Sequence, residues 1–189
     1  GGGVYSYESS GIYTNITFKN NSAGVVGGGM FNSISNSTLT DVTFTGNTAG
    51  LHGGGMYIIT SAPIITNATF TGNSAVEHGG AILHTDAANS VITNSSFINN
   101  KAGRFGGAIA NFSSNPSFTN VTLNGNNGPA GGAMYNQFSA PTLSDVVFQN
   151  NTAEKYGGGI YNEDSDPILI NVTFSGNYSD KGGGLFYYL

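Results

Sequence analysis

The chain has 189 residues, of which 30 are glycine and 8% are charged, and its formal net charge is −5. Twelve Phe and ten Tyr supply enough apolar side chains for a core, which disordered chains lack. Five Lys and Arg in all exclude the clustered cations of a nucleic-acid-binding surface, so no nucleic-acid partner is predicted. There is no cysteine, and no apolar run of about 18 residues could form a transmembrane helix.

A tandem repeat runs through the whole chain. The Phe of the phrase "VTF" and its variants recurs at steps of 26, 26, 27, 26, 25 and 26 residues, and a glycine motif recurs with nearly the same period. Such a period indicates a solenoid or a propeller, and about 26 residues are too few for a propeller blade. Gly, Asn and β-branched residues favour strands and turns over helices. We therefore predict an all-β fold, a single-stranded right-handed parallel β-helix of about seven coils.

The glycine motif opens each predicted coil. It first occurs at Gly1 and last at Gly182, so we expect residues 1–189 to be one β-helix domain and a segment of a longer chain. Its glycines are expected at a sharp turn or a close backbone approach, where a Cβ would clash. Its fourth residue, for example Met30 or Ile82, is expected to point into the core.

A flat strand follows the glycine motif and its loop. Alternation around the inward residue of "TLT" at residues 38–40 points both threonines outward. Strand propensity alone explains much of this pattern, but a flat charge-free face could also bind a ligand or ice, or pack on another copy. The residues of this candidate binding face are Thr14, Thr38, Thr40, Thr66, Thr93, Thr119, Thr142 and Ser144.

Three ladders complete each predicted coil. Asn or Asp three residues before the Phe breaks strand alternation and is expected at a corner, because these residues tolerate left-handed backbone geometry. The expected Asn members of this corner ladder are Asn15, Asn67, Asn94, Asn120 and Asn171. The expected core ladder is Phe18, Phe44, Phe70, Phe97, Phe148 and Phe174. The expected second Asn ladder is Asn21, Asn47, Asn73, Asn100, Asn126, Asn151 and Asn177.

The repeat resembles that of the chlamydial polymorphic outer membrane proteins. That family is marked by F-x-x-N followed by G-G-A-[I/L/V], here "FTGNSAVEHGGAI" from Phe70 to Ile82 and "FINNKAGRFGGAI" from Phe97 to Ile109. The other copies depart at the third or fourth letter of the glycine motif, and Leu123 replaces one Phe. The resemblance covers essentially the whole chain. It implies a surface-exposed β-helical passenger or stalk, often adhesive and often exported through a C-terminal barrel.

Catalytic and metal-binding residues are not predicted. Glu163, Asp164 and Asp166 crowd one loop and could do acid–base work or hold calcium, but no Arg, Lys or His falls at the equivalent place in the flanking coils. His52 and His78 should stack about 5 Å apart, a separation that could hold a metal. Their column varies from Val to Lys in other coils, so we attribute the pair to loop variation and expect no cofactor.

N-x-S/T glycosylation sequons are abundant, but in some of them the Asn belongs to the corner ladder. Packing explains the sequons of the corner ladder, where a buried Asn could carry no glycan. Of the other sequons, those of Asn36, Asn111 and Asn177 are the better candidates.

Together these features predict a non-enzymatic extracellular or outer-membrane-surface protein, an adhesin or a segment of a surface filament. Its expected partners are other copies of itself or host and surface glycans or proteins. The alternatives are an ice-binding protein that uses the threonine face and a polysaccharide-active lyase or hydrolase.

Overall fold

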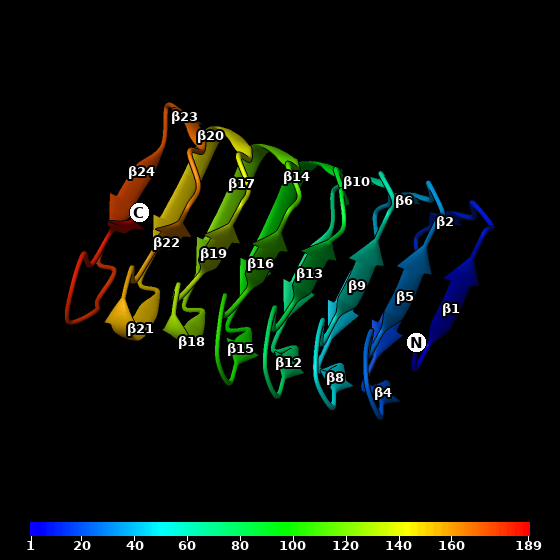
Figure 1. Cartoon of the computed structure of the whole chain (residues 1–189). Coiled ribbons are helices and arrows are strands. Elements are labelled where there is room, and N and C mark those ends of the chain that lie inside the picture. Colours follow the sequence, from blue (N-terminus) through cyan, green and yellow to red (C-terminus); the bar gives the residue numbers. More distant parts are fainter.

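The computed structural model describes all residues from 1 to 189, in 25 strands and no helix. The chain therefore has no helical segment of the length and apolarity that a bilayer span needs. The strands form three parallel sheets along one right-handed solenoid of about seven coils, as the repeat predicts (Figure 1).

Each coil contributes one strand or strand pair to every sheet, with few exceptions at the ends. Sheet 1 contains β1 (Val4–Tyr7), β5 (Met30–Ser33), β9 (Met56–Ile59), β13 (Ile82–Thr85), β16 (Ile109–Phe112), β19 (Met134–Gln137), β22 (Ile160–Glu163) and β25 (Leu185–Tyr188). Sheet 2 contains β2 (Ile12–Thr14), β3 (Thr17–Lys19), β6 (Thr38–Thr40), β7 (Thr43–Thr45), β10 (Ile64–Thr66), β11 (Thr69–Thr71), β14 (Val91–Ile98), β17 (Ser117–Asn124), β20 (Thr142–Gln149), β23 (Ile168–Ile170) and β24 (Thr173–Ser175). Sheet 3 contains β4 (Ser22–Ala23), β8 (Thr48–Ala49), β12 (Ser74–Ala75), β15 (Lys101–Ala102), β18 (Asn127–Ala130) and β21 (Thr152–Tyr156).

The core is a set of like-on-like columns. Phe44, Phe70 and Phe97 occupy equivalent positions in successive coils and are fully buried. Their rings stack with centroids 4.7 and 4.8 Å apart, which is the spacing of neighbouring strands. The repeat period thus follows from strand pairing, since a residue can stack on its equivalent only if each coil has the same length.

The second Asn ladder is a buried hydrogen-bond chain. The Oδ1 of Asn73 accepts from the backbone N and the Nδ2 of Asn47, at 3.0 and 2.9 Å. The Nδ2 of Asn73 donates to Phe44 O and to the Oδ1 of Asn100, at 2.9 and 3.0 Å. Each amide therefore ties its own coil to both neighbours and leaves no buried donor unpaired.

The corner ladder makes the predicted bend but remains in solvent. Asn67 and its equivalents have φ near +50°, the left-handed geometry that Asn and Asp tolerate best. Their side chains are exposed, and they bond in separate pairs, such as Asn67 Nδ2 to Asp41 Oδ1 at 3.0 Å. The idea that burial would block glycosylation at these asparagines is therefore wrong.

The glycine motif places backbone against backbone. Gly53 has φ +63°, and a Cβ on Gly54 would lie 2.3 Å from both Gly80 O and Ser74 O. A side chain at this second glycine would thus collide with the next coil, which accounts for the pair "GG" in every repeat.

A third polar ladder lies inside sheet 1 and was not predicted from the sequence. Asn111 is fully buried, and its Nδ2 donates to Asn136 Oδ1 at 2.7 Å.

The ladders decide two of the three glycosylation candidates. Because Asn111 is buried in the third ladder, the prediction that it is glycosylated is wrong. Asn177 is also unsuitable, because its Nδ2 donates to Phe148 O within the second Asn ladder. Asn36 is exposed and stays a candidate.

His84 continues this third ladder. The amide oxygen of Asn111 faces His84 Nδ1 at 2.8 Å, so Nδ1 carries the proton and Nε2, 2.7 Å from Ser90 Oγ, accepts from the hydroxyl. Complete burial lowers the pKa of His84 to about 4, although the hydrogen bond to Asn111 opposes this shift. His84 is thus a neutral structural residue at pH 7.

Candidate functional site

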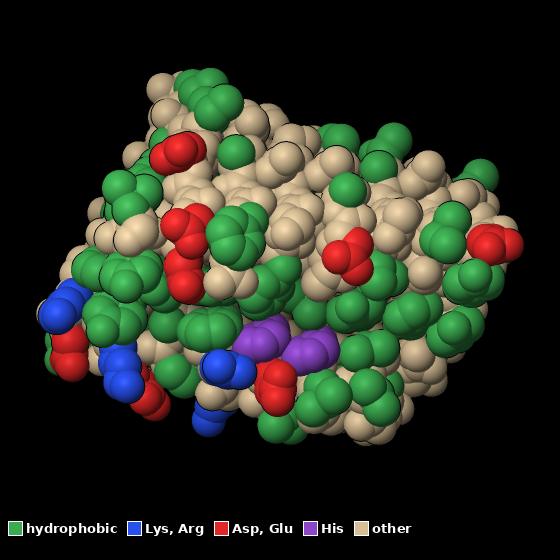
Figure 2. Space-filling model, in the orientation of Figure 1, with side chains coloured by type: hydrophobic (Ala, Val, Ile, Leu, Met, Phe, Trp, Pro, Cys, Tyr) green, Lys and Arg blue, Asp and Glu red, His purple; other side chains and the backbone are tan.

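An aromatic band runs along the outward face of sheet 1, and the imidazoles of His52 and His78 connect its two parts. Figure 2 shows hydrophobic side chains running along this face, with histidines near the middle. Within it, Tyr5 and Phe31 stack at 4.7 Å and Phe105 and Tyr135 at 4.3 Å. We define the aromatic band as Tyr5, Phe31, Tyr57, Phe105, Phe112, Tyr135, Tyr156, Tyr161 and Phe186. Its C-terminal part forms a second hydrophobic cluster outside the core.

A groove of about 420 Å³ opens along the C-terminal part of the band. The glycine motif turns the chain from sheet 3 into sheet 1, which sets the segment of β21 beside the outward face of β22. Tyr156 from β21 and Tyr161 from β22 therefore face one another, with ring centroids 5.5 Å apart. The lining residues are Arg104, Phe105, Pro129, Ala130, Glu154, Lys155, Tyr156, Tyr161 and Glu163.

Polar groups in the groove combine charges of both signs with protonated phenols. Tyr135 is buried and does not itself line the groove, but its hydroxyl donates to the lining residue Glu163 at Oε2. Burial, followed by this hydrogen bond, raises the pKa of Tyr135 far above its usual value. Burial and the charge of Glu163 raise the pKa of Tyr161 to about 12. Arg104 and Lys155 form no ion pair, since the only close contacts between a basic side chain and a carboxylate are those of His52 and His78 with Glu77. The groove can thus donate and accept hydrogen bonds at neutral pH.

The acidic loop does not act as one cluster. Glu163 lines the aromatic groove, whereas Asp164 and Asp166 line a separate shallow hollow beside Phe138. Conversely, Arg104 lies in the groove with Glu163 although the two are far apart in the repeat unit. Comparing equivalent positions of the repeat does not reveal that Arg104 lies near Glu163, because the groove joins loops from different positions of the repeat unit.

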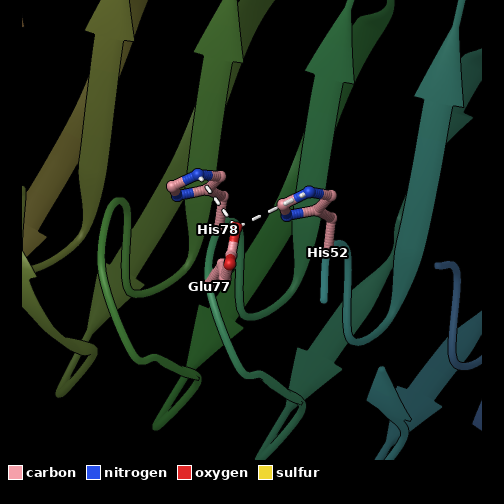
Figure 3. Close-up of side chains that lie close together, drawn as sticks. All are labelled: His52, Glu77 and His78. Atoms are coloured by element: carbon pink, nitrogen blue, oxygen red, sulfur yellow. Dashed lines mark ion pairs between the residues drawn. The ribbon is translucent and has the colours of Figure 1, made fainter. Parts of the chain in front are cut away.

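Two imidazoles and a carboxylate meet on the same face, near the centre of the aromatic band. His52 and His78 stack in parallel with ring centroids 4.9 Å apart, as the strand spacing predicts. Glu77 Oε2 lies 3.9 Å from His52 Nε2 and 3.6 Å from His78 Nε2 (Figure 3). Burial lowers the pKa of both histidines, that of His78 to about 4, so both rings are neutral at pH 7. Sequence reasoning paired the histidines but did not include Glu77.

The threonine face forms as an outward row on sheet 2. Thr40, Thr66 and Thr93 occupy one register column, and the hydroxyl of Thr93 donates to that of Thr66 at 3.2 Å. A parallel column begins with Ile12, which is 82% exposed, and continues through Thr38 and Ile64. These columns carry no charge, and no pocket lies over them.

One sequence signal could have revealed the aromatic band. The residue after the inward fourth letter of the glycine motif is Tyr or Phe in six of eight copies: Tyr5, Phe31, Tyr57, Tyr135, Tyr161 and Phe186, with Leu83 and Ala110 in the other two. Alternation places this column outward, so its large aromatic side chains lie outside the central core.

Comparison with known protein families identifies the family of this chain. The family described as "right handed beta helix region" matches residues 30–188. The chain belongs to the right-handed β-helix family. This β-helix family includes both enzymes, such as pectate lyases, and proteins without enzymatic activity. Neither the curated proteins nor the solved structures gave a match to this β-helix.

Proposed function

We propose that this β-helix is a non-enzymatic extracellular or cell-surface adhesin that binds a polysaccharide chain along its aromatic band. The observation that carries the proposal is the groove in which Phe105, Tyr156 and Tyr161 line up beside charged side chains. Sugar rings present apolar C–H faces to aromatic rings and hydroxyl groups to charged partners. A largely apolar groove with a few placed polar groups is the usual form of a small-molecule or cofactor site, and we extend it to a sugar chain.

The shape of the aromatic band favours a linear polymer. The band spans sheet 1 from β1 to β25, and seven steps at about 4.8 Å per coil give roughly 34 Å. Such a length accommodates several consecutive sugar units of one chain. Because no coil adds more than a few aromatic contacts, affinity is expected to rise with the length of the oligosaccharide.

The surface location rests on the sequence rather than on the groove. The paired F-x-x-N and G-G-A motifs resemble those of polymorphic outer membrane proteins, whose β-helices are displayed outside the cell.

Polysaccharide binding can be measured by affinity electrophoresis in gels that contain neutral or uronate-rich polysaccharides. The wild-type chain should be retarded by at least one of them, and Tyr156→Ala should lower the affinity about tenfold or more. Alanine is tolerated at this position, since Ala130 is the equivalent residue one coil earlier and is bridged to Phe105. Tyr178→Ala is the matched control, because Tyr178 is 63% exposed and does not line the groove.

Three results would contradict the proposal. No retardation by any polysaccharide would remove the ligand class, and equal retardation of Tyr156→Ala would remove the groove. New reducing or unsaturated sugar ends in the same incubation would identify an enzyme, for which Glu163 and Arg104 would be the first residues to test.

The threonine face supports a second candidate, ice binding. Its exposed column alternates threonine with isoleucine and valine, as in Thr38, Ile64 and Val91, on a charge-free row. Thermal hysteresis and ice shaping of the purified chain test this function. Sedimentation at rising concentration distinguishes it from lateral packing of copies, which would bury the same face.

A further inference from the structure

We propose that His52, Glu77 and His78 bind one divalent transition metal ion, such as Zn²⁺, which clamps two successive coils together. The three groups offer two imidazole nitrogens and one carboxylate, the donor types that Zn²⁺ accepts in proteins. Their ligating atoms lie within 4.8 Å of one another. This site is independent of polysaccharide binding, although it lies on the same face.

The backbone holds the two histidines one coil apart. His52 and His78 form a parallel bridge, and the amide of Gly53 donates to His78 O at 3.0 Å. The amide of Glu77 donates to Leu51 O at 2.8 Å, which places the backbone of Glu77 beside both histidines. Three ligands are therefore brought together by the ladder of the solenoid itself, with no need for a loop to fold around the ion.

The side chains are free to close on an ion. Neither ring makes a hydrogen bond: both Nδ1 atoms are buried without a partner, and both Nε2 atoms lie beyond hydrogen-bond distance from Glu77. Two nitrogens on one tetrahedral zinc lie about 3.4 Å apart, so the rings must tilt toward each other by on the order of 1 Å. No hydrogen bond opposes that tilt, and the Glu77 side chain is 39% exposed, which leaves room for another rotamer that reaches the ion.

The surroundings leave one side of the ion open. His78 packs against Phe105 and Phe112, with ring centroids 5.2 Å away in both cases, which closes the inner side of the cluster. His52 and Glu77 have side chains 23% and 39% exposed, so water can complete the fourth position. Such an arrangement resembles an accessible metal site rather than a fully enclosed structural one.

Isothermal titration of the untagged chain with ZnCl₂ tests the site. We expect one Zn²⁺ per chain with micromolar affinity and a rise in Tm, and no response to Mg²⁺ or Ca²⁺. His78→Phe should abolish binding yet keep the stack, because the next residue in the column is Phe105. His84→Asn is the matched control, since it removes a histidine outside the cluster and should bind Zn²⁺ as the wild type does.

Glu77→Gln separates the three-ligand site from a simple histidine pair. It should weaken zinc binding at least tenfold while leaving the far-ultraviolet circular dichroism unchanged. The proposal is overturned by stoichiometric zinc binding that persists in His78→Phe, by no binding in the wild type, or by unchanged affinity in Glu77→Gln.

Discussion

Replacing Asn100 with alanine should be among the most destabilising single changes in this β-helix. The Oδ1 of Asn100 accepts from the backbone N of Asn73 at 2.9 Å and from its Nδ2 at 3.0 Å. Alanine would orphan two buried N–H groups, the backbone amide of Asn73 and the one N–H of its Nδ2 that does not donate to Phe44 O. Each orphaned donor costs about 1–3 kcal/mol, so the expected loss in the free energy of unfolding is about 4 kcal/mol. This is a large share of the roughly 5–15 kcal/mol that stabilises an ordinary domain.

Urea unfolding followed by circular dichroism measures this loss. Asn127→Ala is the control, because the side chain of Asn127 is exposed in the same coil and should change stability by no more than about 0.5 kcal/mol. If the two variants unfolded within about 1 kcal/mol of each other, the Asn ladder would carry no net stability. The reasoning from unsatisfied donors would then be refuted.

Three further changes probe other parts of the scaffold. Phe70→Ala should cost about 3–5 kcal/mol in urea unfolding, since Phe70 is fully buried between two stacked rings, and a loss below about 1 kcal/mol would contradict close packing. Gly54→Ala should prevent folding or lower Tm sharply, whereas Gly24→Ala, with no atom near its added Cβ, should be nearly neutral; equal effects would exclude the backbone clash. Burial depresses the pKa of His84 to about 4, below its unfolded value, so its stabilising contribution is lost as pH falls from about 6.5 toward 4. The free energy of unfolding should drop by about 3 kcal/mol more in the wild type than in His84→Asn, and equal pH profiles would contradict the shift.

The interior of this β-helix could be predicted because it depends on two local rules. Strand alternation decides which residues point inward, and the constant period stacks them on their equivalents. Phe70 and Asn73 follow from these rules alone. The same rules place Asn111 inside, because it lies two residues after the inward Ile109, although its sequon taken alone indicates a surface residue.

The candidate sites were harder to predict because each brings together residues from non-equivalent positions of the repeat unit. The groove joins Arg104, on the turn before sheet 1, to Glu163 at the end of a sheet 1 strand two coils away. Glu77 meets His52 because its backbone bonds to Leu51 in the preceding coil. Neither contact connects equivalent positions, so a comparison of repeat columns cannot reveal it.

Whether a side chain points inward or outward explains why some columns of the repeat are invariant and others vary. The column of His52 reads Val26, His52, His78, Phe105, Ala130, Tyr156 and Lys181, all joined by backbone bridges. The column of Asn47 is Asn in all seven coils. Both columns share the same strand spacing, but only the buried amide must satisfy donors on two neighbours. An outward position lacks that constraint, so it can exchange an aromatic ring for an imidazole or a cation without disturbing the coil. The departures from the repeat on the outer face of sheet 1 are therefore where ligand chemistry is expected in this solenoid.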